Sequence, residues 1–154
     1  MSCSTEFSEY LRGFTLIEVL IVLAIIAVLI VIAVPSYQAG ISQGRRADGR
    51  AFALDLAARE EAYFLRNGSY TSDLETESGL NGSVLSQERF YIGSVGPCED
   101  GDLVNCFQVK VSALGIQRAS DQTCVSLTIT NTGERGSSDS MGVFSEANSG
   151  ARCW

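Results

Sequence analysis

The chain has 154 residues, a formal net charge of -7 and no histidine. The lack of histidine excludes Ser-His-Asp and Cys-His catalysis and histidine-based zinc sites. An acidic chain is also a poor generic partner for nucleic acid, because contacts to phosphate dominate that affinity. Nothing in the sequence matches a phosphate loop, a nucleotide fingerprint or a nucleophile elbow, so we expect no enzyme, no cofactor and no metal site.

A long uncharged segment lies near the N-terminus, since no charged residue occurs between Glu18 and Arg45. Residues 19–34 are apolar without interruption. As a helix, residues 14–34 would span about 30 Å, the thickness of the hydrocarbon core of a bilayer. The segment is apolar on every helical face and follows an acidic stretch, which fits neither a core helix nor a cleaved secretory signal. We predict one membrane-spanning helix.

Glu18 is the one charge inside this apolar segment. A carboxylate in a membrane costs on the order of 3 kcal/mol and is a functional candidate by default. If the chain were cut between Gly13 and Phe14, the new amine would lie one helical turn from Glu18 and would neutralise it together with the helix dipole. The amine of a neighbouring subunit could do the same. Such a pair would fix the axial register of packed apolar helices, because a mispaired charge there is costly.

The motif Gly13-Phe14-Thr15-Leu16-Ile17-Glu18, with the apolar run and Pro35-Ser36-Tyr37 after it, resembles the N-terminus of type IV prepilins. The resemblance implies that residues 1–13, including Cys3, are a leader peptide that prepilin peptidase removes. It implies N-methylation of Phe14, Glu18 as the acid at the fifth mature position, and a helix kink at Pro35.

The resemblance also implies a topology: a cytoplasmic leader, residues 14–38 as a single-pass helix in the bacterial inner membrane, and residues 39–154 as a globular pilin domain outside it. The positive-inside rule disagrees, because acids precede the segment and arginines follow it. We follow the resemblance. The following arginines have helical spacing and are expected to form a solvated face; they are Arg45, Arg46 and Arg50.

Beyond the anchor, apolar residues recur at helical spacing, which predicts an amphipathic helix that packs on the domain. Asn67-Gly68 is a natural stop, so one helix is expected from about Phe14 to Arg66. Gly40 and Gly44 indicate either flexibility or a close helix approach. The predicted stripe is Ala47, Ala51, Leu54, Ala58, Ala62 and Leu65, widened by Phe52, Leu56 and Tyr63.

The remaining pattern predicts an α+β pilin fold, in which the amphipathic half of the helix packs on a small antiparallel sheet and the hydrophobic half protrudes. Residues 69–87 are polar and loop-like, with a short helix around 71–80. Alternating residues predict strands at 90–92, 107–113 and 125–129. Residues 131–140 are rich in turn formers and are expected to form an exposed loop.

Four cysteines follow the anchor and allow three pairings, which in an exported domain indicate disulfides. The segments from Cys124 to Thr128, from Thr132 to Gly136 and at Cys153-Trp154 resemble the C-terminal part of PilE-type minor pilins of the type IVa pilus. The resemblance implies a Cys124–Cys153 bond, and we choose Cys98–Cys106 as the second. The acidic turn inside that second loop lacks the spacing of a calcium site, so a solvated turn is expected.

The resemblance implies a structural minor pilin that acts in pilus biogenesis, twitching motility and adhesion. Its location is the inner membrane before assembly and the extracellular pilus afterwards. Its implied partners are other major and minor pilins, prepilin peptidase and the inner-membrane assembly platform, and nucleic acid is not expected. The alternatives are the major pilin of the same system, a type II secretion pseudopilin, and a pilus-associated DNA-uptake receptor.

Overall fold

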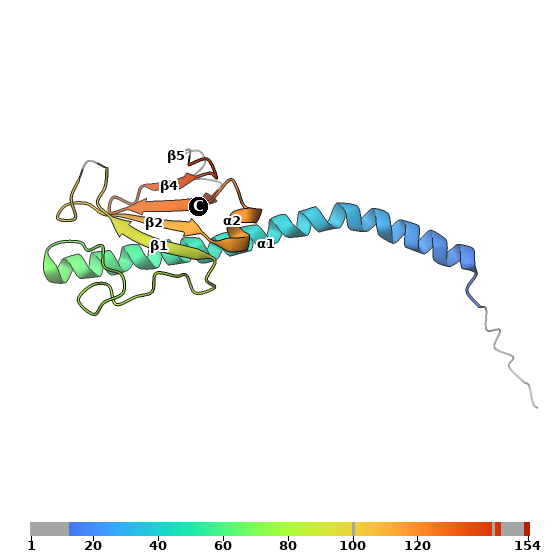
Figure 1. Ribbon diagram of the computed structural model, residues 1–154, viewed down its shortest axis with the longest axis horizontal. Coiled ribbons are helices and arrows are strands. Elements are labelled where there is room, and N and C mark those ends of the chain that lie inside the picture. Colours follow the sequence, from blue (N-terminus) through green and yellow to red (C-terminus); the bar gives the residue numbers. More distant parts are fainter. Residues whose placement is uncertain (1–12, 100, 143, 146–152) are drawn as a thin grey trace, which may run out of the picture. The chain divides into compact units, whose positions relative to one another are not determined.

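The computed structural model describes residues 13–99, 101–142, 144–145 and 153–154; the leader through Arg12, with Cys3, lies outside them, as does Asp100 of the acidic turn. The chain divides into two compact units, Met1–Tyr37 and Gln38–Trp154, each described by itself below. Helix α1 (Leu16–Asn67) begins in the first unit and ends in the second (Figure 1). The helix expected from Phe14 to Arg66 is therefore confirmed to within two residues at each end.

The described part of the first unit is an apolar helix without any cover. The most apolar 18-residue window of α1 has a mean hydropathy of 3.4, and 0% of that window is buried. By length and composition, α1 is the one helix of the described chain that could cross a membrane. Its backbone stays helical through Pro35, and the kink expected there stays a prediction.

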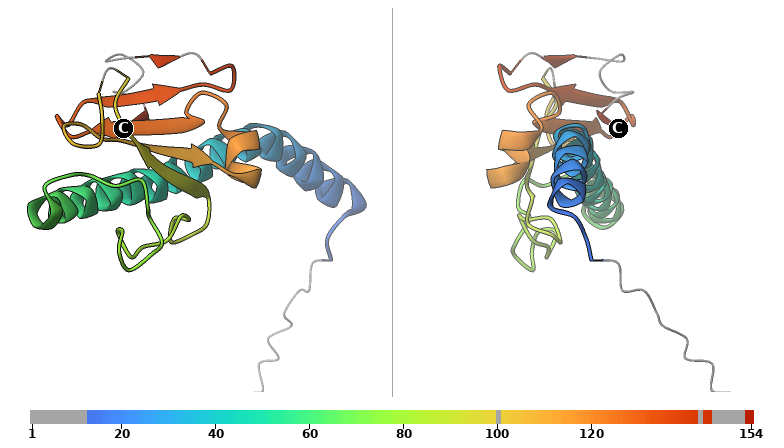
Figure 2. Two further views of the ribbon diagram at one scale, coloured as in Figure 1. Left: turned by 60° about the vertical axis from the view of Figure 1, so that its left-hand side comes forward. Right: turned by 90° about the vertical axis from the view of Figure 1, so that its right-hand side faces the viewer.

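The second unit is built on an antiparallel sheet, as predicted, and its strands are neighbours in chain order (Figures 1 and 2). Across it, Gly93 pairs with Val111, Val111 with Leu127, and Leu127 with Ser137, so these residues share the face that lies against α1. The strands are β1 (Tyr91–Gly96), β2 (Gln108–Ala113), β3 (Ser126–Thr130), β4 (Arg135–Ser138) and β5 (Phe144–Ser145).

Two expectations about local structure are wrong, and one helix was not expected. Strand β4 lies inside the expected loop 131–140, because pairing with β3 outweighs its weak strand propensity. Helix α2 (Gly115–Ser120) was not expected. Residues 71–80 form turns and no helix, because the Asp73 carboxylate accepts hydrogen bonds from the Glu75 and Thr76 N–H groups, both at 3.1 Å, and these compete with helical bonds.

The buried face of α1 is not the predicted stripe. Leu54 is 43% exposed and Leu65 is 84% exposed, and the four alanines of the stripe are exposed as well. The buried face is instead the one with Ala53, Leu56 and the half-buried Phe52, to which the sequence analysis gave only a secondary part. Both faces have helical spacing, but the face with larger side chains removes more apolar area from water.

Helix α1 approaches β1 closely because each of the two elements has a glycine where it contacts the other. A Cβ atom on Gly49 would lie 2.8 Å from the Tyr91 ring, and one on Gly93 would lie 2.7 Å from Leu56. Around Gly40 and Gly44, by contrast, nothing lies within 4 Å of a Cβ position. The close approach within this chain therefore depends on Gly49, not on the two glycines singled out from the sequence.

Two disulfides close the C-terminal half of the second unit. The structure pairs Cys98 with Cys106 and Cys124 with Cys153, as chosen from the sequence, with Cα–Cα distances of 5.7 and 5.6 Å. Cys124 and Cys153 belong to the buried core with Leu127. The longer bridge therefore joins the chain's end to the segment that leads into β3.

Candidate functional site

The first turn of α1 holds Glu18 in a capped geometry. The Glu18 N–H donates to Thr15 Oγ1 at 3.3 Å and to Thr15 O at 3.1 Å. Thr15 therefore caps the helix, and Thr-x-x-Glu is the sequence pattern of a capping box. The cap was not predicted from the sequence, although Thr15 belongs to the same N-terminal motif as Glu18.

The predicted processing point lies just outside the helix. Gly13 and Phe14 precede the capping residue, and both are exposed, Phe14 to 80%. The Gly13–Phe14 peptide bond is therefore in non-helical chain next to Glu18. The large apolar residues that follow are all at least 45% exposed. They are Leu16, Ile17, Val19, Leu20, Ile21, Val22, Leu23, Ile25, Ile26, Val28, Leu29, Ile30, Val31, Ile32 and Val34.

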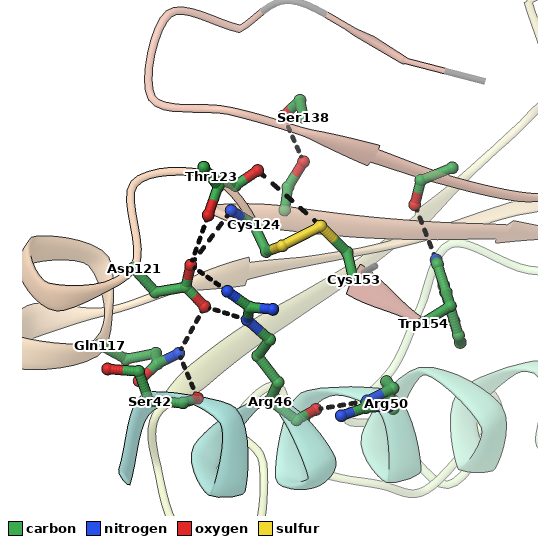
Figure 3. The surroundings of a disulfide bond; sticks show 12 residues. Ser42, Arg46, Arg50, Gln117, Asp121, Thr123, Cys124, Ser138, Cys153 and Trp154 are labelled. Carbon is green, nitrogen blue, oxygen red and sulfur yellow. Dashed lines mark hydrogen bonds and ion pairs between the residues drawn. A yellow bond between two sulfur atoms is a disulfide. The ribbon is translucent and has the colours of Figure 1, made fainter. Parts of the chain in front are cut away.

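A buried ion pair joins α1 to the corner that leads into β3 (Figure 3). Both Arg46 Nε and Arg46 Nη2 donate to the Asp121 carboxylate, the second at 2.8 Å. The Asp121 side chain is 1% exposed and that of Arg46 is 15% exposed. The hydrogen bond to Asp121 raises the pKa of Arg46 despite its burial. Bidentate arginine–carboxylate geometry of this kind fixes orientation as well as charge.

The same carboxylate organises its surroundings. Asp121 also accepts from Gln117 Nε2 and Thr123 Oγ1, both at 3.2 Å, and from the Cys124 N–H at 3.3 Å. Gln117 in turn donates to the backbone oxygen of Ser42 on α1 at 3.2 Å. Helix α1, helix α2 and the Cys124 disulfide are thus held by one polar network.

The arginines of α1 are therefore not the simple solvated face that we expected. Arg46 forms the buried pair, Arg45 lies 4.7 Å from the centroid of the Phe90 ring, and Arg50 is half-buried. Helical spacing alone predicted solvation. The acid that pairs with Arg46 lies 75 residues away and gives no local signal.

Charge is unevenly distributed over the second unit. Four arginines lie on or next to the elements that meet around the beginning of its part of α1, where Ser42 on α1 contacts Ser120 of α2 and Arg45 lies over Phe90. We call the four arginines the basic end; they are Arg45, Arg50, Arg89 and Arg118. Two acids, Asp48 and Glu88, lie among them. The two ion pairs of the described residues use Arg46 and Arg59 instead. The last turns of α1 and the loop packed on them are acidic, with Glu60, Glu61, Asp73, Glu75 and Glu77.

The acidic turn inside the Cys98–Cys106 loop is stabilised by its own hydrogen bonds. The Asp102 carboxylate accepts from the Val104 N–H at 3.1 Å and from the Asn105 N–H at 3.2 Å. No group of three or more metal-ligating side chains occurs in the part of the chain that the structure describes.

Comparison with known families decides the class of the protein. Residues 35–128 match the family described as type IV minor pilin ComP, DNA uptake sequence receptor. Residues 12–34 match the prokaryotic N-terminal methylation motif. The chain belongs to this family of type IV pilins. Proteins of this family are structural pilins and not enzymes, and they assemble with other pilins into filaments.

One curated relative is the type IV wide pilus major component PilA4 of Thermus thermophilus, which is 40% identical over 62 residues. The match covers 40% of this chain and 47% of that protein, so the pilin described here spans about half the length of this relative. The resemblance to type IV pilins that was inferred from the N-terminal motif is confirmed, and the resemblance of the tail to PilE-type minor pilins stays a prediction.

Proposed function

We propose that this pilin is a minor subunit of a type IV pilus that acts in pilus biogenesis, twitching motility and adhesion. The observation that carries the proposal is the uncovered apolar helix with Glu18 capped in its first turn. Before assembly the inner membrane covers residues 14–34, with the N-terminus cytoplasmic and residues 39–154 outside. After assembly the helices of other pilins cover them.

In the proposed mechanism, prepilin peptidase removes residues 1–13 and Phe14 is N-methylated. The inner-membrane assembly platform then inserts the subunit into the filament. Within the packed helices, the Phe14 amine pairs with a Glu18 carboxylate of its own or a neighbouring chain. This pair sets axial register, because a carboxylate without a cation in that apolar environment is strongly unfavourable.

The cap and the register pair are separable by mutation. A capping box can have glutamine in place of glutamate, so Glu18→Gln keeps the cap and removes the charge. Thr15→Ala keeps the charge and removes the cap, which costs about 1 kcal/mol of helix stability. We expect Glu18→Gln to abolish incorporation into sheared pili and Thr15→Ala to reduce it little. Normal incorporation of Glu18→Gln would refute the register pair.

The outer face of α1 in the second unit supports assembly through the same helix. Leu54 and Leu65 are exposed there with four alanines, so that face carries apolar surface that nothing in the described chain covers. Small residues allow helices to approach each other closely, so this face suits the helix of another pilin.

A DNA-uptake receptor is the second candidate, and the family match favours it. The match covers residues 35–128, which lie mostly in the globular unit and not in the N-terminal motif. The net charge of -7 disfavours DNA, but the basic end gathers four arginines away from the acidic loop. Under this proposal the basic end contacts phosphates, and each contact adds to the salt dependence of binding.

The DNA proposal is tested with the full-length protein in detergent and fluorescent duplex fragments of the host's genome. We expect Arg89→Gln/Arg118→Gln to weaken binding and to reduce the slope of log affinity against log salt by about 2. Arg66→Gln, at the acidic side, is the matched control and should leave the slope unchanged. Equal binding by all three proteins, or none by the wild type, would exclude the basic end as a DNA site.

The major-subunit alternative draws on the likeness to PilA4, a major component of a type IV wide pilus. Quantitative mass spectrometry of sheared pili separates the two proposals. A minor pilin should be a small fraction of the pilin signal, whereas dominance of this chain would establish it as the major subunit.

A further inference from the structure

Glu60 is a carboxyl group buried on the face of α1 that packs into the core. Its side chain is 0% exposed, and its neighbours on that face include Ala53 and Leu56, which are also buried. The Thr71 N–H donates to Glu60 Oε2 at 3.1 Å. Glu60 Oε1 has no hydrogen-bond partner among the described residues. A buried acid with one oxygen unpaired is unusual, because desolvation strongly disfavours its charged form.

No described cation compensates this carboxyl group. Arg59, its neighbour on α1, bonds to Asp55 at 2.8 Å. Glu61, on its other side, is a like charge and accepts a hydrogen bond from Tyr70 Oη at 3.4 Å. On the loop that packs against it, the Asp73 carboxylate is bound within its own turn. Of these groups, Glu61 and Tyr70 interact electrostatically with Glu60, and neither is a cation.

Burial raises the pKa of Glu60 from 4.5 to about 7; the charge of Glu61 adds to the rise and the Thr71 hydrogen bond opposes it. The carboxyl group therefore changes charge near neutral pH while it is enclosed.

The segment that encloses Glu60 is residues 69–80. Tyr70 stacks on Phe64 of α1 with ring centroids 4.7 Å apart, and Leu74 and Leu80 are buried. These contacts and the Thr71 N–H bond hold the segment over Glu60. A charge that forms beneath it is stabilised only if water reaches the carboxylate, which requires the segment to move away.

We propose that Glu60 is a proton-dependent clamp, which holds residues 69–80 on α1 while its carboxyl group is neutral and loosens them when it ionises. An acid that binds its proton more tightly in the closed state favours closure at low pH, and this advantage is lost as the pH rises through neutrality. The surface formed by residues 69–80 thus depends on the pH around the exported domain. The inference does not depend on which pilus role the protein has.

The composition of the chain makes this clamp measurable. Because the chain has no histidine, it lacks the side chain that ordinarily changes charge near neutral pH. The Cys3 thiol and the α-amino group, both in the leader, ordinarily change charge between about pH 5.5 and 8.5, so Glu60→Gln is needed to assign a response to Glu60. A pH-dependent change in residues 69–80 that Glu60→Gln abolishes therefore reports Glu60.

The test is hydrogen–deuterium exchange of the full-length protein in detergent, corrected for intrinsic exchange rates. From the pKa values of 4.5 and about 7, local opening of residues 69–80 should increase about 30-fold between about pH 5.5 and 8.5. Peptides from β2 and β3 should not change by this factor. Glu60→Gln mimics the neutral acid, so its residues 69–80 should exchange equally at both pH values.

Glu61→Gln is the matched control, since it removes the neighbouring acid and keeps Glu60; its loop should still respond to pH. A pH-independent loop in the wild type would overturn the proposal, as would a response that persists in Glu60→Gln. If Glu60→Gln does not fold, the side-chain carboxyl NMR signal of Glu60 decides in the wild type. Titration near 4.5 would overturn the clamp, and titration near 7 together with loop opening would support it.

Discussion

Removing Asp121 should destabilise the second unit more than most single substitutions do. Asp121→Ala leaves the Arg46 guanidinium, 15% exposed, without its carboxylate. Breaking a buried pair from one side costs about 3–5 kcal/mol, and partial hydration of Arg46 places this loss near 3 kcal/mol. The buried Cys124 N–H loses an acceptor as well, which adds about 1 kcal/mol. We therefore expect the free energy of unfolding to fall by about 4 kcal/mol.

Urea unfolding of the full-length protein in detergent measures this loss. Trp154 is the chain's one tryptophan, and its Nε1–H donates to Gly136 O at 2.8 Å, so its fluorescence reports this part of the fold. Arg46→Met and Arg46→Met/Asp121→Ala complete a double-mutant cycle with Asp121→Ala. Replacing both partners by apolar residues is near neutral, so the double variant should be more stable than either single variant.

The exposed Arg59–Asp55 pair provides the control. Arg59→Met should change the free energy of unfolding by less than about 1 kcal/mol, because exposed pairs contribute little. If the losses of Arg46→Met and Asp121→Ala instead add in the double variant, the two residues are not coupled and the reasoning is refuted.

Three further predictions use the same unfolding assay. Gly93→Ala should cost about 1–3 kcal/mol, because its Cβ would lie 2.7 Å from Leu56, whereas Gly40→Ala, in open space, should be neutral or stabilising; the reverse order would contradict the packing. Cys124→Ser/Cys153→Ser should cost about 3.6 kcal/mol, because that disulfide joins residues 29 apart in sequence. Removing the Cys98–Cys106 disulfide, with a separation of 8, should cost about 2.5 kcal/mol, and equal losses would contradict the loop-entropy explanation. Leu65 is 84% exposed, so Leu65→Gln should change the free energy of unfolding by less than about 0.5 kcal/mol, whereas Leu56→Ala, at a buried position, should cost about 2–5 kcal/mol. Leu65→Gln should nevertheless reduce incorporation into sheared pili, and normal incorporation would show that the outer face of α1 makes no contact with other pilins.

The sequence was sufficient to predict the features that repeat over many residues. The extent of α1 follows from a long apolar run, helical spacing and the Asn67-Gly68 stop. The antiparallel sheet follows from alternation in 107–113 and 125–129. Both patterns express local geometry, because side chains recur on one face every 3.6 residues in a helix and every 2 in a strand.

The features that depend on distant parts of the chain could not be predicted in the same way. Arg46 looked solvated because Asp121 lies far along the sequence. Strand β4, with Gly136 and Ser137, forms because β3 offers a partner edge. The face of α1 that is buried could have been chosen better by weighing side-chain size, since Leu56 and Phe52 outweigh a stripe of alanines.

In the candidate site, too, the features set by local sequence were predictable and those set by distant residues were not. The first turn of α1 depends on local sequence alone, so the motif was enough to predict roles for Gly13, Phe14 and Glu18, and the Thr15 cap could have been predicted from it too. Glu60 was overlooked because a glutamate on a helix is usually solvated. Its burial depends on the loop at residues 69–80, whose turns gave no sign of what they would cover.

Mass spectrometry of the protein recovered from sheared pili tests the central claim most directly. The account predicts an N-terminal peptide that begins at N-methylated Phe14, with the leader absent. A mature chain that keeps residues ahead of Phe14, or one that begins beyond Pro35, would contradict it, because the amine that is proposed to pair with Glu18 would then not exist.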